Sequence, residues 1–156
     1  MLKRVASEKA PAPEPTGIRV YVYRDIPPDE SYVKDDYYEF NDIGGSFTAE
    51  ELCMRVARDL GIGSLAYQLF ALQTIDKNPV WLAPNEEIAC DEEACCQLRF
   101  RLRFMPPQSK MRQLASGQDE AAFNYFFLQC RYDFVEDKIK YEEGRLSQDK
   151  ALGIAL

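Results

Sequence analysis

Residues 46–60 read SFTAEELCMRVARDL, and every local signal in this stretch favours an α-helix. Thr48 is predicted to cap the helix, because its hydroxyl can accept from the backbone N–H of Glu51 while the Glu51 carboxylate accepts from the backbone N–H of Thr48. Gly61 stands where the helix should end, since glycine adopts the left-handed conformation of a helix C-terminus without steric cost. The stretch therefore predicts a helix with two defined ends.

One side of this helix is apolar, because its apolar residues recur at helical spacing while the charged residues face away. The apolar residues are Leu52, Cys53, Val56, Ala57 and Leu60. A helix of about three turns is only marginally stable by itself, so this side must pack against other elements of the chain.

Strands are predicted on both sides of the helix from alternating or continuous apolar residues. The segments are 18–24 (IRVYVYR), 37–43 (YYEFNDI), 67–73 (YQLFALQ), 80–82 (VWL) and 97–104 (QLRFRLRF). The last segment alternates most clearly. Its residues predicted to point inward are Leu98, Phe100, Leu102 and Phe104. A shift of one residue would bury its arginines, so the register of this strand is fixed.

The element order β-β-α-β-β-β predicts an α+β fold, in which one amphipathic helix crosses one face of a mixed sheet. This is the ubiquitin-like β-grasp arrangement, and we assign it to residues 18–105. Residues 1–17 contain three prolines and few large apolar side chains, which predicts a disordered N-terminal segment. Residues 106–118 are predicted to be a linker, and residues 119–156 the beginning of an incomplete, all-helical lobe.

The predicted helical lobe begins with a long helix over residues 119–139. Its apolar face consists of Phe123, Phe126, Phe127, Cys130 and Phe134, which we expect to pack inside a helical bundle. Ser147 is predicted to cap a further helix that runs to Leu156, so the remaining helices of the bundle would lie outside these 156 residues.

Charge and cysteine content exclude several classes of protein. The net charge of −7 argues against nucleic acid as the main partner, because binding to phosphates requires a basic surface. The sequence has no run of about 18 apolar residues and no apolar segment typical of a signal peptide. Five cysteines at irregular spacing indicate reduced thiols. We therefore expect an intracellular protein.

The sequence predicts no catalytic, cofactor-binding or metal-binding residues. It contains no histidine, which excludes histidine triads and histidine metal sites. Gly44–Gly45 lacks the lysine and the spacing of a phosphate-binding loop, and no string resembles a kinase catalytic loop. Cys90, Cys95 and Cys96 lie among acidic residues without the spacing of a zinc site, so we expect an acidic surface loop with incidental thiols.

Four arginines form the single candidate binding face. They are Arg19, Arg99, Arg101 and Arg103, brought together if the strand at 18–24 pairs with the strand at 97–104. Three interpretations remain open at this point: a solvated sheet face with cation–π contacts, a face that docks on another domain of the same protein, or a site for an anionic lipid or nucleic acid.

Six strings, in order, resemble the FERM domains of Janus kinases, the tyrosine kinases associated with cytokine receptors. They are TAEELC at 48–53, LFAL at 69–72, VWLAPN at 80–85, FRLRF at 100–104, YFFLQCRYDFV at 125–135 and ALGIAL at 151–156. The resemblance implies a FERM first lobe of ubiquitin-like fold, followed by the start of a helical second lobe of acyl-CoA-binding-protein-like fold.

By the same resemblance, the full protein would be a cytoplasmic, membrane-associated tyrosine kinase that uses ATP and Mg²⁺ at an active site beyond Leu156. Its complete FERM domain would anchor it to a cytokine receptor tail at the inner face of the membrane, for JAK-STAT signalling. The alternative is a FERM scaffold without kinase activity, which links membrane proteins or anionic lipids to the cytoskeleton.

Overall fold

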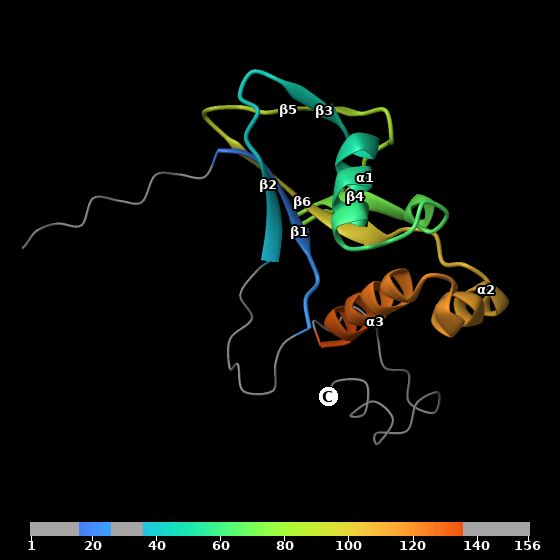
Figure 1. Cartoon of the computed structure of the whole chain (residues 1–156). Coiled ribbons are helices and arrows are strands. Elements are labelled where there is room, and N and C mark those ends of the chain that lie inside the picture. The colour runs from blue at the N-terminus through green and yellow to red at the C-terminus, as the bar shows by residue number, and fades with distance from the viewer. Residues whose placement is uncertain (1–15, 26–35, 136–156) are drawn as a thin grey trace, which may run out of the picture.

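The structure is a computed structural model, and it describes residues 16–25 and 36–135. Its centre is a four-stranded mixed sheet in the order β2-β1-β6-β4 (Figure 1). β1 pairs antiparallel with β2 and parallel with β6, and β6 pairs antiparallel with β4. The strands are β1 (Gly17–Val22), β2 (Asp36–Phe40), β4 (Phe70–Thr74) and β6 (Cys95–Leu102). The predicted α+β fold with a mixed sheet is confirmed.

α1 (Ala49–Asp59) is the helix predicted from the capping signals. The backbone N–H of Glu51 donates to the Thr48 hydroxyl at 3.2 Å, and the backbone N–H of Thr48 donates to the Glu51 carboxylate at 3.0 Å. Gly61 has a φ of +75°, the left-handed conformation expected just beyond the helix. Both predicted ends of the helix are therefore confirmed.

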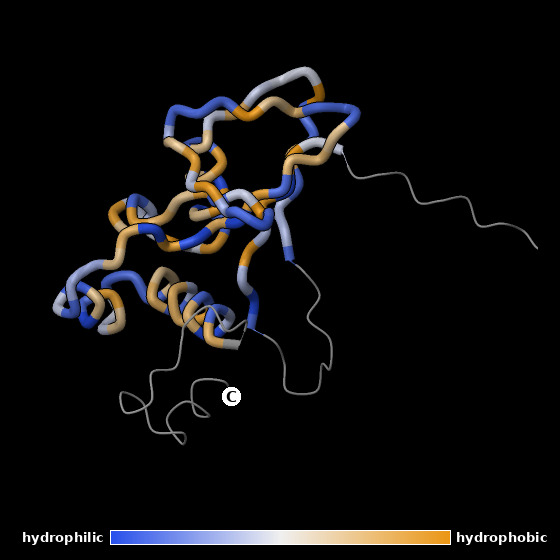
Figure 2. Tube along the Cα trace, turned by 180° about the vertical axis from the view of Figure 1, so that it is seen from behind, coloured by the Kyte–Doolittle hydropathy of each residue, from blue (hydrophilic) through white to orange (hydrophobic). Residues whose placement is uncertain are grey.

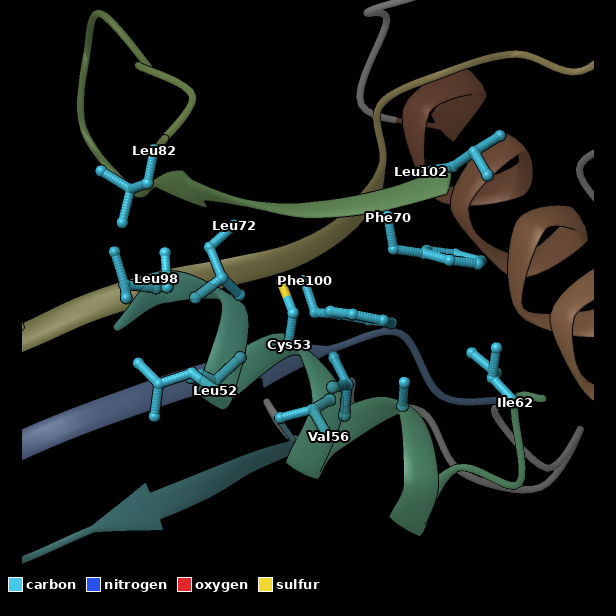
Figure 3. Close-up of a cluster of buried hydrophobic side chains, with 14 of the residues drawn as sticks. Leu52, Cys53, Val56, Ile62, Phe70, Leu72, Leu82, Leu98, Phe100 and Leu102 are labelled. Atoms are coloured by element: carbon cyan, nitrogen blue, oxygen red, sulfur yellow. The ribbon is translucent and has the colours of Figure 1, made fainter. Parts of the chain in front are cut away.

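The core lies between the apolar side of α1 and one face of the sheet (Figure 3). Side chains from the helix and from three strands are fully buried there. They are Ile18, Val20, Leu52, Val56, Leu72, Leu98 and Phe100. The Phe70 and Phe100 rings stack with their centroids 4.9 Å apart. The predicted inward face of β6 is confirmed as far as Leu102, which is 8% exposed.

Phe104 was predicted to continue that inward face, and this prediction is wrong. β6 ends at Leu102, and the backbone N–H groups of Arg103 and Phe104 both donate to the carbonyl of Leu69. The chain therefore turns away from the sheet, and the Phe104 side chain is 54% exposed.

The structure contains two short strands that the sequence analysis missed. β3 (Ser46–Thr48) pairs antiparallel with β5 (Glu87–Ala89) in a separate two-stranded sheet. The predicted strand at 80–82 is reduced to one isolated bridge between Trp81 and Gln73, and the first three residues of the strand predicted at 67–73 form a short 3-10 helix, η1 (Tyr67–Leu69). Strands of three residues carry too little alternation to be recognised from sequence.

Three helical segments follow β6. α2 (Gln108–Gln113) and a π-helical turn, η2 (Leu114–Gln118), occupy the stretch assigned as a linker, and α3 (Glu120–Val135) begins the predicted helical lobe. α3 lies next to the end of the sheet (Figure 1), and Figure 2 shows hydrophobic residues along most of its length. No helix in the described part of the chain is long and apolar enough to cross a membrane.

The core contact between α1 and the sheet gives a first prediction. Leu52→Ala is expected to lower the free energy of unfolding by about 3 kcal/mol, because Leu52 is fully buried and the substitution leaves a cavity. The matched control is Met54→Ala in the same helix, which should change it by less than about 0.5 kcal/mol since Met54 is 44% exposed. Urea unfolding measures both, and equal effects would contradict the assigned face of α1.

Candidate functional site

The candidate site is the contact between α3 and the end of β6 that has no neighbouring strand on the β1 side. β1 pairs with β6 only as far as Arg99, so the last residues of β6 have no strand beside them on that side. Buried backbone N–H and C=O groups need hydrogen-bond partners. In this structure α3 supplies these partners. We call this region the interlobe contact, because α3 lies in the predicted helical lobe. It consists of Tyr23, Phe100, Arg101, Leu102, Tyr125, Gln129 and Asp133.

Tyr125 connects β6 to the segment that follows β1. Its hydroxyl donates to the carbonyl of Phe100 at 2.7 Å and accepts from the backbone N–H of Tyr23 at 3.3 Å. The ring also packs edge-on against Phe100, with centroids 5.3 Å apart. One side chain of α3 thus bridges two backbone segments at the place where they separate.

Gln129, one helical turn later, pairs with the backbone of Leu102 as a neighbouring strand would. Its Oε1 accepts from the Leu102 N–H at 2.7 Å, and its Nε2 donates to the Leu102 carbonyl at 3.4 Å. Gln129 is only 6% exposed. A buried amide is favourable here because both of its polar ends are bonded.

Asp133, a further turn along α3, forms a two-pronged ion pair with Arg101. Arg101 Nη1 donates to Oδ1 at 3.0 Å and Nη2 donates to Oδ2 at 2.6 Å, while Nη1 also donates to the Tyr23 hydroxyl at 2.8 Å. The two charged side chains are 14% and 11% exposed. Among the described residues, the buried Nε of Arg101 has no hydrogen-bond partner. The pair fixes the rotation of α3 because its geometry allows one alignment.

Asp119 fixes the N-terminal end of α3. Its Oδ1 accepts from the backbone N–H of Ala122 at 3.1 Å, as a helix cap does, and its Oδ2 accepts from the backbone N–H of Gly63 at 2.8 Å. A Cβ at position 63 would lie 2.8 Å from this carboxylate oxygen. Only glycine leaves room for this bond. With Asp119 at its first end and Asp133 near its last described residue, α3 is attached to the sheet lobe at two separate places.

Burial shifts the pKa values of the groups in this contact. Burial raises the pKa of Tyr125 well above its ordinary value, and it raises the pKa of Tyr23 despite the nearby Arg101 and Arg99 charges. Burial would lower the pKa of Arg101, but the hydrogen bond to Asp133 and the proximity of Tyr23 outweigh it, so that pKa is raised. The contact therefore holds neutral phenols and a charged guanidinium at neutral pH.

The phenylalanine stripe of α3 does not make this contact. The α3 residues most deeply buried against the sheet lobe are Ala122, Tyr125, Gln129 and Asp133, all 8% exposed or less, and Phe126 is partly buried beside them. The expected bundle core is half-buried or open among the described residues, with Phe127 51% exposed. The contact residues were not predicted, because they do not follow the apolar spacing that indicates the buried side of a helix. A Tyr-Gln-Asp row at intervals of four residues was the available signal.

The four arginines of the candidate binding face have different surroundings. Arg19 pairs with Glu39 at 3.1 Å, and Arg101 is buried against α3. The Arg99 guanidinium lies among tyrosine rings, and that of Arg103 lies 5.8 Å from the Trp81 ring centre. Arg101 is therefore held against α3 by an ion pair, and Arg99 contacts α3 through the Tyr132 ring.

The described cysteines show no sign of a metal or redox site. No group of three or more metal-ligating side chains occurs in the part of the chain that the structure describes. Cys90 is buried, and its thiol donates to the carbonyl of Phe40 at 3.1 Å. Burial raises the pKa of Cys53 to about 12, and it also raises the pKa values of Cys95, Cys96 and Cys130. Raised pKa values make these four thiols poor nucleophiles at neutral pH.

One known protein family matches more than half of this chain. Residues 18–112 match the family described as the FERM F1 ubiquitin-like domain. The chain belongs to this family. The FERM resemblance and the ubiquitin-like fold predicted from the sequence are thereby confirmed, and α3, which begins beyond the matched residues, packs on the FERM F1 lobe.

The similar curated proteins are Janus kinases, as the sequence strings indicated. The chain is 26% identical over 125 residues to tyrosine-protein kinase JAK1 of Danio rerio, covering 64% of this chain and 11% of that protein. It is 25% identical over 128 residues to tyrosine-protein kinase hopscotch of Drosophila melanogaster, covering 76% and 10%. For tyrosine-protein kinase JAK3 of Rattus norvegicus the identity is 28% over 123 residues, covering 72% and 11%. The chain thus spans about a tenth of the length of these relatives.

Solved structures with a similar fold are FERM domains. The FERM and C-terminal domain complex of Drosophila Merlin has a TM-score of 0.53 at 16% identity, covering 82% of this chain and 39% of that one. The MyTH4-FERM MF2 domain of Dictyostelium discoideum myosin VII has a TM-score of 0.52 at 15% identity, covering 80% and 25%. At this identity the likeness supports the fold alone.

The interlobe ion pair gives a second prediction. Asp133→Ala is expected to lower the free energy of unfolding by about 2–3 kcal/mol, because it leaves the Arg101 guanidinium buried without its counter-ion. The control is Arg131→Ala, which removes a 3.5 Å pair to Asp25 whose side chain is 80% exposed, with an expected change below about 0.5 kcal/mol. Urea unfolding and amide exchange along α3 measure the effect. An equal loss of unfolding free energy in the two variants would show that the buried pair stabilises the fold no more than the exposed pair.

The buried phenols give a third prediction, on alkaline stability. The folded pKa of Tyr125 lies above its ordinary value of 10.0, so its stabilising contribution is complete below that pH and is lost as the pH rises towards the folded pKa. Each such group steepens the fall by about 1.4 kcal/mol per pH unit. Tyr125→Phe should remove one such contribution above about pH 10. Urea titrations at several pH values test this, and an unchanged slope in Tyr125→Phe would contradict it.

Proposed function

We propose that this chain is the FERM portion of a Janus-kinase-like tyrosine kinase, and that it positions the kinase at the cytoplasmic tail of a cytokine receptor. The observation that carries the proposal is the match to three Janus kinases over 64–76% of the chain, together with the FERM F1 match. Under this proposal the chain itself is a binding and positioning module, and the phosphoryl transfer with ATP and Mg²⁺ takes place elsewhere in the full protein.

The geometry supports a positioning role. Asp119, Tyr125, Gln129 and Asp133 attach α3 to the FERM F1 lobe by directional hydrogen bonds at both ends of the helix. A neighbouring side of α3 carries the phenylalanine stripe, of which Phe126 packs against the core and Phe127 is 51% exposed, so its outer residues are available to helices of a second lobe. A module built in this way holds its two lobes at a fixed angle, as a receptor-binding surface shared between lobes requires. The protein would work in the cytoplasm at the inner face of the membrane, through its receptor.

The reading frame beyond the Leu156 codon is the direct test. We expect the transcript to continue through further helices into a protein tyrosine kinase domain. A frame that runs instead into a rod or an actin-binding tail would support the alternative, a FERM scaffold without kinase activity. A stop codon directly after Leu156 would remove the kinase proposal for this chain.

A fourth prediction concerns where the receptor binds. The full-length protein should bind a membrane-proximal cytokine-receptor tail peptide at least about tenfold more tightly than residues 1–156 alone, because the missing helices are expected to complete the site. Fluorescence anisotropy with one labelled peptide measures both affinities, and a scrambled peptide is the control. Equal, tight binding by the short chain would show that the FERM F1 lobe and α3 already contain the receptor site.

A further inference from the structure

Arg99 is held in a cage of tyrosine rings on the outer face of the sheet. Its guanidinium carbon lies 5.0 Å from the ring centre of Tyr132, 5.4 Å from that of Tyr23 and 5.9 Å from that of Tyr21. These rings come from α3, from the segment after β1 and from β1 itself. The interlobe contact therefore builds the cage, because Tyr132 reaches Arg99 only when α3 is docked.

Three arginines on this side of the molecule have acidic partners among the described residues, whereas Arg99 and Arg103 have only aromatic rings beside them. Arg19 pairs with Glu39, Arg101 with Asp133 and Arg131 with Asp25. Arg99 makes ring contacts in their place. Its side chain is partly exposed, so an incoming group can reach it.

A caged guanidinium without a counter-ion is suited to bind an anion. A cation–π contact attracts the charge of the guanidinium and leaves its N–H donors in the plane of the group for other partners. The rings also limit the rotamers of the side chain, so less entropy is lost when a ligand binds. The chemistry of this position therefore favours one carboxylate or other planar anion, held in two-pronged fashion.

The charge distribution favours an acidic protein segment over a membrane. Binding to anionic lipid needs several free basic residues, since each contributes about 1 kcal/mol. Here Arg19 and Arg101 are paired with Glu39 and Asp133, which leaves Arg99 and Arg103 without an acidic partner among the described residues, fewer than lipid binding needs. Arg99 lies between rings from three segments of the chain, and such a guanidinium fits a single acidic side chain of an extended peptide.

We propose that Arg99, with the rings of Tyr21, Tyr23 and Tyr132, is a docking site for an acidic side chain presented by a peptide segment of a protein partner. The site goes beyond the receptor-positioning function proposed above and does not depend on a kinase. The site exists only while α3 is docked, because Tyr132 belongs to α3. Binding at this site therefore requires α3 to be packed on the sheet lobe.

A fifth prediction tests this site with a peptide of alternating glutamate and alanine. In an NMR titration of the full 156-residue chain, the peptide should shift the Arg99 side-chain signal and the Tyr21 and Tyr132 ring signals. A twin peptide with glutamine in place of glutamate should not, because it lacks the anion. Arg99→Gln should weaken binding about tenfold or more. The matched control, Arg103→Gln, removes the same charge just beyond the end of β6 and should leave binding within about twofold.

Further variants separate the site from general effects of charge and folding. Arg99→Lys keeps the charge but not the two-pronged donor geometry, and it should also weaken binding. Retention of the tyrosine ring shifts of the folded chain in each variant shows that it is still folded. Equal weakening by Arg99→Gln and Arg103→Gln would overturn the proposal, as would shifts spread over the whole surface. Sedimentation with phosphatidylserine vesicles in an Arg99-dependent manner, without peptide binding, would assign the site to a membrane instead.

Discussion

The unpaired end of β6 is the constraint on which the arrangement of the molecule depends. Beyond Arg99 this strand has no neighbour on the β1 side, yet Phe100 and Leu102 are buried in the core. Their backbone groups must therefore be bonded by something other than a strand. Tyr125 and Gln129 provide those bonds, and this requirement explains why α3 turns a polar row towards the sheet lobe although phenylalanines are available on the same helix.

Strand alternation and helix docking together give the three arginines in and just after β6 three environments. Arg99 and Arg101 lie on the same face of β6 because side chains alternate, and Arg103 follows directly after the strand. Asp133 of α3 meets only Arg101, so that guanidinium is buried and paired. Arg99 lies at the margin of the helix, among tyrosine rings, and Arg103 lies past the end of the strand, near Trp81. The pattern RFRLR is regular, but the positions are not equivalent once α3 is in place.

Local signals made the β-grasp lobe predictable, and the interlobe contact depended on information that no local pattern contains. The capping box of Thr48 and Glu51 and the alternation of β6 specify their elements within a few residues of sequence. The position of Gln129 acquires its meaning only from the place where β1 leaves β6, more than 25 residues earlier in the chain. Phe104 was misplaced for a related reason, since alternation continues in the sequence after the strand has ended. In both cases, the contact of Gln129 and the exposure of Phe104, long-range hydrogen bonds and not local sequence propensities determine the structure.

A polar contact is also the arrangement best suited to set an angle between two lobes. An apolar face can slide or rotate against another with little loss, because dispersion and burial have no preferred direction. The row of Tyr125, Gln129 and Asp133 bonds a backbone carbonyl, the N–H and C=O of one residue, and a guanidinium, each of which favours one geometry. A buried polar network of this kind, in which Arg101 Nε alone among the described buried side-chain atoms lacks a partner, specifies one arrangement even where its net contribution to stability is modest. The exposed part of the phenylalanine stripe, such as Phe127, can then supply burial energy to a further packing partner.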